Sequence, residues 1–295
     1  PGHITGFFTI HEQSKQILKR GSLGAGFSIK QGVKTSITKN ESQTQIYINN
    51  KKSPNAYVSS SVIRLFEEAS GISVNHVNIA HSIDLPPGSG FGTSGAGAIG
   101  LALALNEYYS SELGFEQCMQ IAHKAEIECR TGLGTVIGEA YGGFEIRTEP
   151  GAPGVGKINK ISSVNDDSQG IFLVYGPIST KLALSDPEKR KAINTAGEAA
   201  LYRMKNRPSI GTFLSESRNF SLQSGLLTKE CRKIIEFFDT IGITSGMLMF
   251  GNGVFTVSKQ SESKSLCEHL KSRFSKAYVF SCEIDNEGGR ILEHS

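Results

Sequence analysis

The chain has 295 residues, of which 38% are hydrophobic and 20% are charged, and its formal net charge at pH 7 is +3. This composition is typical of a globular protein with enough apolar side chains for one large or two moderate domains. The positive charges are scattered along the chain, which argues against a nucleic-acid-binding face, although a mild positive excess suits small anionic substrates.

The cysteines and the apolar runs indicate the compartment. The five cysteines contain no C-x-x-C pair, so we expect reduced thiols and neither a disulfide framework nor a zinc site. The apolar stretch Leu101–Leu105 is far too short to span a membrane, and no signal peptide is visible. We therefore expect a cytoplasmic protein without a membrane partner.

The first part of the chain predicts short strands joined by turns. Apolar, β-prone residues lie at Phe7–Ile10, and alternating patterns lie at Gly32–Thr38 and Gln45–Ile48. Between the first two lies Arg20–Gly26, which we interpret as a glycine loop with an arginine at its mouth. This loop is either a plain hairpin connection or a place where Arg20 and backbone N–H groups meet a carboxylate or phosphate.

A helix is expected over Tyr57–Ser70, because its apolar residues share one face. Val77–Leu85 then places apolar side chains mostly at alternate positions, as in an antiparallel strand with one buried face. A further helix is expected over Gly114–Cys129, and it is followed by the glycine-containing runs Thr131–Val136 and Gly142–Arg147.

The densest pattern of the chain is Pro86–Gly97, which holds five glycines, two prolines and three hydroxyl side chains. Glycines allow positive φ angles and let a ligand approach the backbone closely. The apolar, proline-free run that follows predicts a helix from near Thr93. The N-terminus of this helix would direct unpaired N–H groups and a positive dipole end at a ligand, which suits a phosphate.

A purely structural glycine turn competes with the functional interpretations of this loop. A Walker A loop is excluded because no Gly-Lys-Ser/Thr follows at the required spacing. Gly90 to Gly95 fits the dinucleotide pattern G-x-G-x-x-G, and Glu112 follows about twenty residues on. A dinucleotide loop, however, follows a continuously apolar parallel strand, whereas Val77–Leu85 alternates.

The second half of the chain begins after Glu149–Gly156, the most linker-like composition in the sequence. We therefore expect an N-terminal domain over residues 1–156 and a C-terminal domain over residues 157–295. The expected elements of the second half are a buried strand, a turn with a hydroxyl and an amine, three helices, a glycine-punctuated segment, a helix and a strand: Gly170–Gly176, Pro177–Lys181, Pro187–Met204, Ile210–Ser224, Thr228–Ile241, Ser245–Phe255, Glu262–Phe274 and Ala277–Ile284.

Three segments together resemble the GHMP kinase superfamily over nearly the whole chain. Pro1–Phe8 and Ser245–Gly253 match the first and third family motifs in form. Pro86–Ala96 resembles the phosphate loop Pro-x-x-x-Gly-Leu-Gly-Ser-Ser-Ala, with Phe, Thr and Gly in place of Leu, the first Ser and the first Ala. Within the superfamily the likeness is closest to the archaeal pantoate kinases, which share His-x-Ala-Glu at 123–126, Thr-Gly-Leu-Gly at 131–134 and Ile-Ser-Thr-Lys at 178–181.

The resemblance implies an α+β fold in two parts, with mixed or antiparallel sheets and an active site in the cleft between them. It implies a kinase that uses ATP and Mg²⁺ to phosphorylate a primary hydroxyl of a small hydroxy acid. The implied substrate is pantoate, the implied product is 4-phosphopantoate, and the implied pathway is archaeal coenzyme A biosynthesis. A homodimer is plausible by family likeness alone.

The same resemblance assigns the site residues. Backbone N–H groups of the loop would hold the ATP phosphates, and the oxygens of Ser94 and Glu126 would bind Mg²⁺, since a hard cation prefers oxygen. Ser94 can equally be a helix cap, and Glu126 a solvated carboxylate. The assigned catalytic residues are Ser94, Glu126, His123 and Thr135; the nucleotide residues are Pro87, Gly88, Ser89, Gly90, Phe91, Gly92, Thr93, Ser94, Gly95 and Ala96; and the substrate residues are His3, Arg20, Ser22, Arg147, Thr180 and Lys181.

Two of these assignments have plain structural alternatives. His123 lies one helical turn before Glu126, but a single histidine on a helix is more often structural. Arg147 and Arg20 are the candidates for the substrate carboxylate, because the planar guanidinium pairs with it through two hydrogen bonds. Lys181 is a weaker candidate, because a lysine in a turn is usually solvated.

Thr135 departs from the family pattern. Pantoate kinases carry an aspartate after Gly-Leu-Gly that takes the proton of the alcohol, and a threonine cannot act as a base near neutral pH. Glu139 lies one helical turn further on, if this stretch is helical. Loss of a general base removes about 10²–10⁴-fold in rate rather than all activity. This departure leaves mevalonate 3-phosphate, phosphorylated on its 5-hydroxyl, as an alternative substrate, and a non-catalytic regulatory protein of the same fold as an alternative class.

Overall fold

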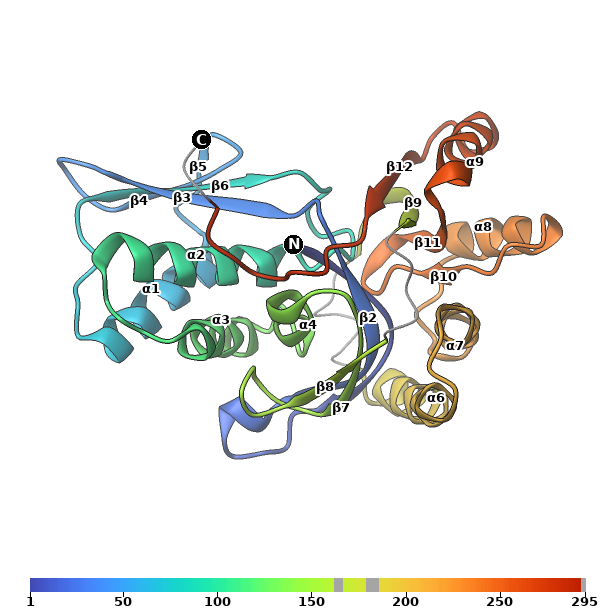
Figure 1. The fold of residues 1–295 in the computed structure, drawn as a ribbon, viewed down its shortest axis with the longest axis horizontal. Coiled ribbons are helices and arrows are strands. Elements are labelled where there is room, and N and C mark those ends of the chain that lie inside the picture. The colour runs from blue at the N-terminus through green and yellow to red at the C-terminus, as the bar shows by residue number, and fades with distance from the viewer. Residues whose placement is uncertain (162–166, 179–185, 293–295) are drawn as a thin grey trace.

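The computed structural model describes residues 1–161, 167–178 and 186–292, and in these it contains three four-stranded sheets (Figure 1). The central sheet has the strand order β1-β2-β7-β8 and is antiparallel throughout. Its strands are β1 (Gly2–His11), β2 (Gly21–Ile29), β7 (Phe144–Glu149) and β8 (Lys157–Lys160). A short 3-10 helix, η1 (Ile17–Lys19), lies between β1 and β2.

The prediction of a glycine loop over Arg20–Gly26 is wrong, because Gly21–Gly26 form the first part of β2 and Arg20 directly precedes the strand. The glycines serve close approach between strands and not a turn. A Cβ atom on Gly24 would lie 2.1 Å from the Phe7 carbonyl oxygen, and a Cβ atom on Gly26 would lie 2.4 Å from that of Ile4. The N-terminal sheet therefore needs glycine in the strand itself.

The second sheet, of order β3-β6-β4-β5, is mixed, since β6 pairs antiparallel with β3 and parallel with β4. Three helices pack beneath it, and α2 lies between this sheet and the other helices (Figure 1). The strands are β3 (Val33–Lys39), β4 (Gln45–Ile48), β5 (Lys51–Lys52) and β6 (Val77–Ile83), and the helices are α1 (Tyr57–Ser70), α2 (Thr93–Tyr109) and α3 (Phe115–Cys129).

The third sheet, of order β10-β11-β9-β12, is antiparallel and lies at the other end of the molecule. Its strands are β9 (Ser168–Pro177), β10 (Gly246–Met247), β11 (Gly251–Lys259) and β12 (Tyr278–Glu283). Four helices accompany it: α6 (Pro187–Asn206), α7 (Ile210–Gln223), α8 (Lys229–Thr240) and α9 (Gln260–Arg273).

The two ends of the chain share one apolar core. Helices α6 and α7 contact β1 of the central sheet, and Phe213 of α7 packs against Phe27, Phe144 and Phe255 at ring-centroid distances of 5.6–5.9 Å. The expected division after residue 156 falls between β7 and β8, which pair in the same sheet. After β12 the chain returns across the N-terminal half (Figure 1), where the Gly289 N–H donates to the Glu139 carbonyl oxygen.

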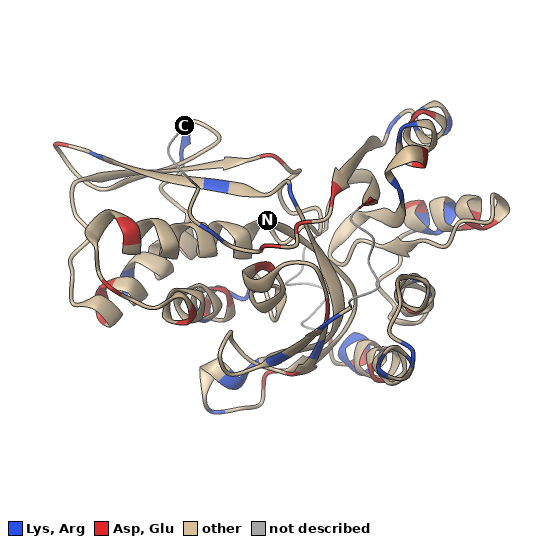
Figure 2. Cartoon of the chain, viewed as in Figure 1, with Lys and Arg blue, Asp and Glu red and all other residues tan. Residues whose placement is uncertain are grey.

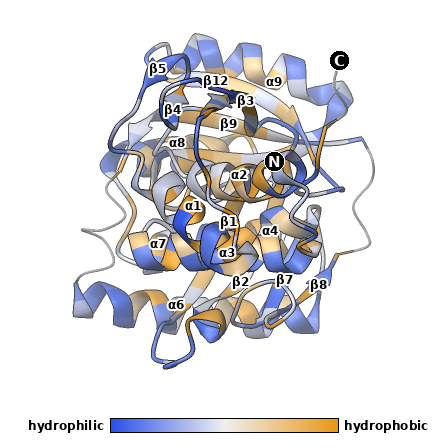
Figure 3. Ribbon diagram, turned by 90° about the vertical axis from the view of Figure 1, so that its left-hand side faces the viewer, coloured by the Kyte–Doolittle hydropathy of each residue, from blue (hydrophilic) through white to orange (hydrophobic). Residues whose placement is uncertain are grey.

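Charge and hydropathy follow this layering. Both positive and negative side chains occur on the outer helices, and α2 carries a single charged residue, Glu107 (Figure 2). The outer helices α6 and α9 are largely hydrophilic (Figure 3). Among the described residues, no helix is both long and apolar enough to cross a membrane. All five cysteines are free thiols, as the sequence predicts.

Candidate active site

A cavity of about 410 Å³ opens where the loop before α2 faces the central sheet and the third sheet. Its wall is formed by strands β1 and β2, by the loop, by the segment that leads from α3 into α4, and by the turn before β11. Helix α4 spans Thr135–Tyr141. The lining residues are His3, Thr5, Phe8, Ser22, Gly88, Gly90, Phe91, Gly92, Thr93, Ser94, Glu126, Cys129, Arg130, Thr131, Gly132, Leu133, Gly134, Thr135, Met249 and Phe250.

The glycine-rich loop takes the conformation that its composition predicts. Gly88, Gly90 and Gly92 have φ angles of +69°, +87° and +66°, which residues other than glycine rarely adopt. Gly92 is the residue immediately before α2, so the first N–H groups of a helix of 17 residues begin at the cavity wall. Such a helix N-terminus favours an anion.

Phe91 fixes the loop to the rest of the molecule. Its ring is 1% exposed and packs against Phe172 and Phe280 at 5.3 and 5.7 Å between ring centroids. Its carbonyl oxygen accepts a 2.9 Å hydrogen bond from the His3 N–H. The loop is therefore anchored to both β1 and the third sheet.

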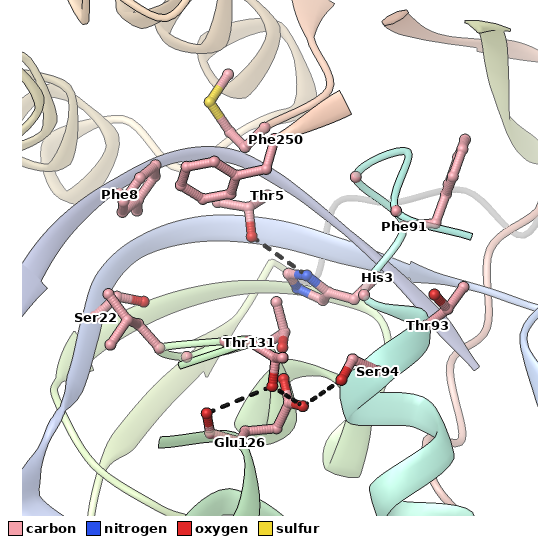
Figure 4. A pocket seen from close by; sticks show the side chains of 18 of the residues that line it. His3, Thr5, Phe8, Ser22, Phe91, Thr93, Ser94, Glu126, Thr131 and Phe250 are labelled. Carbon is pink, nitrogen blue, oxygen red and sulfur yellow. Dashed lines mark hydrogen bonds between the residues drawn. The ribbon is translucent and has the colours of Figure 1, made fainter. Parts of the chain in front are cut away.

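Ser94, Glu126 and Thr131 form a cluster of oxygens at the end of the cavity next to α2 (Figure 4). The Ser94 hydroxyl donates to Glu126 Oε1 over 2.5 Å, and the Thr131 hydroxyl donates to the same oxygen over 2.6 Å. Burial raises the pKa of Glu126, and the two hydroxyl hydrogen bonds oppose this shift. An all-oxygen cluster of this kind suits a hard divalent cation.

Below the cavity lies a buried ionic group. His3 Nε2 is 2.9 Å from Glu145 Oε1, and Arg147 Nη1 donates to the same oxygen over 2.6 Å. The second oxygen of Glu145, and Nε and Nη2 of Arg147, are buried and have no hydrogen-bond partner among the described residues. His3 alone of this group lines the cavity, where Thr5 Oγ1 lies 3.4 Å from its Nδ1.

The opposite end of the cavity is apolar. Phe8 and Phe250 face each other with ring centroids 5.5 Å apart (Figure 4), and Met249, next to Phe250 in the chain, also lines the cavity. The cavity thus combines a glycine-rich loop at the N-terminus of a helix, an oxygen cluster and an apolar wall, an arrangement that suits a nucleotide and a small acceptor.

Comparison with known proteins agrees with this geometry. The chain is 37% identical to a pantoate kinase from Methanocaldococcus jannaschii, over 92% of this chain and 96% of that protein. It is 32% identical to a pantoate kinase from Thermococcus kodakarensis, over 90% of this chain and 88% of that protein. Residues 56–143 match the protein family described as "GHMP kinases N terminal domain". The chain belongs to the GHMP kinases, in the family of the pantoate kinases.

Solved structures agree with this assignment. A protein described as a phosphotransferase related to the coenzyme A biosynthesis pathway has a TM-score of 0.86 and 30% identity, over 98% of this chain and 95% of that one. A mevalonate kinase, at 16% identity and a TM-score of 0.71 over 97% of this chain and 98% of that one, shares the fold. The α+β GHMP kinase fold expected from the sequence is confirmed, and so is a kinase that uses ATP.

The structure brings many of the residues assigned by the GHMP kinase resemblance to one cavity. These residues are His3, Ser22, Gly88, Gly90, Phe91, Gly92, Thr93, Ser94, Glu126 and Thr135. Pro87, Ser89, Gly95 and Ala96 belong to the same loop or helix start but do not line the cavity. Thr180 and Lys181 lie outside the described residues.

His123, Arg20 and Arg147 do not line the cavity. His123 is buried, and its Nε2 donates to the Arg20 carbonyl oxygen over 3.0 Å; burial lowers the pKa of His123 to about 4. The Arg20 guanidinium donates to the Ser14 carbonyl oxygen over 2.7 Å. In this structure the three residues hold the chain around the cavity.

Sequence reasoning did not assign half of the lining to the site. Thr131–Gly134, Phe8 and the Met249–Phe250 pair all lie in motifs that the GHMP kinase resemblance uses, so their motifs could have identified them. Arg130 lies in none of these motifs, so the sequence does not point to it. It is the C-cap of α3, with a φ angle of +56°, and this left-handed turn brings it to the rim.

Proposed function

We propose that this GHMP kinase transfers the terminal phosphoryl group of ATP to the primary hydroxyl of pantoate, with Mg²⁺ as the metal. One observation carries the proposal: the oxygens of Ser94, Glu126 and Thr131 converge at the start of α2, beside the glycine loop and inside the same cavity. The identity of 31–37% with three pantoate kinases over about nine-tenths of the chain supports the choice of substrate.

The loop and α2 supply the nucleotide site in this proposal. The glycines Gly88, Gly90 and Gly92 leave the backbone open to the triphosphate, and the first N–H groups of α2 donate to it. The apolar wall of Phe8 and Phe250 accommodates groups of the ligands that carry no charge. Phosphoryl transfer depends mainly on the positioning of the reactants and on neutralisation of the phosphate charge. The loop positions the triphosphate, and its N–H groups neutralise part of the charge.

The residues of the oxygen cluster fit Mg²⁺. Ser94 Oγ and Glu126 Oε1 lie 2.5 Å apart, and Mg²⁺ is usually held by one or two protein oxygens together with phosphates and water. No group of three or more His, Cys, Asp or Glu side chains that could hold a metal occurs among the described residues, which agrees with so small a set of protein ligands. When bound, Mg²⁺ neutralises charge on the phosphates.

Positive charge on the sheet side suits an acceptor that carries a carboxylate. Arg130 lines the rim, and Arg147 lies beneath His3 with two unpaired nitrogens. We propose that His3 and Ser22, which line the cavity, orient the carboxylate of pantoate, and that the positive charge of Arg147 behind His3 attracts it. Burial lowers the pKa of Arg147 and the Glu145 carboxylate opposes this shift, so the guanidinium gains from a second anionic partner.

A turnover assay tests the proposal. Release of ADP with Mg²⁺ is measured in parallel with pantoate, with mevalonate and with mevalonate 3-phosphate. We expect turnover with pantoate and none above background with the other two. Turnover only with mevalonate 3-phosphate would replace the substrate while keeping the kinase, and ATP binding without turnover of any acceptor would favour a regulatory protein.

A further inference from the structure

Glu139 is a buried carboxyl group that the proposed function does not use. It lies in the middle of α4, is fully shielded from solvent, and neither of its oxygens has a hydrogen-bond partner among the described residues. A buried carboxyl without partners costs free energy of folding. A residue of this kind beside a cavity suggests a role in the reaction.

The carboxyl of Glu139 lies between the phosphate loop and Thr135. A Cβ atom built on Gly92 would be 2.2 Å from Glu139 Oε1, and one built on Gly95 would be 2.4 Å from Oε2 and 3.1 Å from Thr135 Oγ1. The carboxyl group of Glu139 therefore lies against the backbone of Gly92 and Gly95, on the side of Gly95 that Thr135 also faces. Thr135 and Glu139 are also four residues apart on one helix, which makes their side chains neighbours.

The other acidic groups around the cavity are less suited to accept a proton than Glu139. Glu126 Oε1 accepts two hydroxyl hydrogen bonds, and Glu145 is bound by His3 and Arg147. Burial raises the pKa of Cys129, which lowers its fraction of thiolate. Burial also raises the pKa of Glu139 well above its usual value, and the nearby carboxylates of Glu126 and Glu145 add to this shift.

We propose that Glu139 takes the proton of the acceptor hydroxyl through the hydroxyl group of Thr135. As the acceptor oxygen bonds to the terminal phosphorus of ATP, the bond from that phosphorus to the bridging oxygen breaks and ADP leaves. The acceptor proton passes to Thr135 Oγ1, whose own proton passes to Glu139 over one water, because neither oxygen of Glu139 is hydrogen-bonded to Thr135 in this structure. After the product leaves, Glu139 returns the proton to solvent by the same route.

This inference rests on the proposed kinase reaction and gives each residue a distinct role. Thr135 lines the cavity and touches the acceptor, whereas Glu139 acts through Thr135 and is a positioning residue. The arrangement supplies, over two side chains, the proton acceptor that a threonine alone cannot provide.

Substitution with rescue tests the inference. Glu139→Gln keeps the size of the side chain and removes its capacity to accept a proton, so we expect kcat with pantoate to fall by about 10²-fold while KM for ATP changes little. In the double variant Thr135→Asp, Glu139→Gln a carboxylate at the cavity wall replaces the two-residue route, and we expect it to recover most of the lost kcat. The matched control is Glu68→Gln, an exposed residue of α1 remote from the cavity.

Each outcome decides the inference. Thermal unfolding and binding of a fluorescent ATP analogue first establish that Glu139→Gln is folded and binds nucleotide. A kcat of Glu139→Gln equal to that of wild type overturns the inference while the proposed function stands, and so does loss of kcat with no recovery in the double variant. A wild-type protein that does not turn over pantoate overturns the proposed function, and the inference falls with it.

Discussion

At the scale of single residues, the site is built from carboxyl groups that are buried before any ligand binds. Glu126, Glu139 and Glu145 are all at most 2% exposed, although burial of charge is unfavourable without partners. Arg147, His3 and two hydroxyl groups compensate part of this. We propose that a cationic ligand relieves the remaining imbalance of charge at Glu126, and that this ligand is the metal.

Glu126→Gln tests this assignment. The amide keeps the size of the side chain but is a far weaker metal ligand, so we expect kcat to fall by about 10²-fold or more. The free energy of unfolding should not fall, because a buried charge is removed. Steady-state kinetics over a series of Mg²⁺ concentrations and a urea titration measure the two effects. The control is Glu128→Gln, an exposed residue of the same helix paired with Arg64; equal kcat in the two variants would contradict the assignment.

At the scale of elements, α2 positions the phosphate loop because its first turn lies against α4. The contact is so close that Gly95 has no space for a side chain, since a Cβ atom would lie 2.4 Å from Glu139 Oε2. Two residues on, Gly97 has room for a methyl group, because the nearest atoms would lie 3.9 Å from such a Cβ atom, at ordinary van der Waals distance. The two glycines therefore form a matched pair for mutation.

Gly95→Ala should displace the start of α2 and raise KM for ATP by roughly tenfold, a loss of about 1.4 kcal/mol in binding. Gly97→Ala should leave KM unchanged and stabilise the protein by about 0.5–1 kcal/mol, because alanine is the better helix former. Initial-rate kinetics and chemical denaturation measure both. If the two variants had the same KM for ATP, packing of α2 against α4 would not position the loop.

A second link between elements is His81, which joins β6 to β3 and α1. Its Nδ1 lies 2.9 Å from Thr35 Oγ1 and its Nε2 lies 3.0 Å from Ser59 Oγ. Burial lowers the pKa of His81 from 6.5 to about 4. Between these two pH values the unfolded chain binds the proton and the folded chain does not, so stability falls as the pH falls through this window.

Urea titrations at pH 7 and pH 5 measure this effect. His81 should account for a loss of roughly 2 kcal/mol between the two pH values. In His81→Gln, which cannot titrate, the difference in unfolding free energy between pH 7 and pH 5 should be smaller by that amount. An unchanged difference would mean that His81 keeps an ordinary pKa in the folded protein.

At the scale of the whole molecule, we propose that the two halves expected from the sequence unfold together. Phe213 of α7 contacts rings of both the central sheet and the third sheet, and β8 follows the linker-like turn yet pairs with β7. Phe213→Ala should destabilise the protein by about 3–5 kcal/mol in a single transition. Calorimetry that resolves two transitions, only one of them shifted, would contradict a shared core.

The sequence predicts most of this architecture because helices and strands are indicated by local patterns of apolar, glycine and proline residues. The periodicity over Tyr57–Ser70 coincides with α1, and the expected helix start near Thr93 is the start of α2. The strand β2 was missed because glycine marks both a turn and a close contact between strands, and only the partner strand distinguishes the two. Likewise, nothing local shows that Arg130 reaches the cavity or that Arg147 pairs with Glu145 beneath it.

We propose that the cavity positions a primary hydroxyl against the terminal phosphate of ATP. The most direct measurement is the position of the new phosphate ester after incubation with ATP, Mg²⁺ and pantoate, read from phosphorus–carbon coupling in the NMR spectrum. We expect an ester on the primary carbon of pantoate, formed one for one with ADP. An ester on the secondary hydroxyl, or ADP released with inorganic phosphate alone, would contradict it.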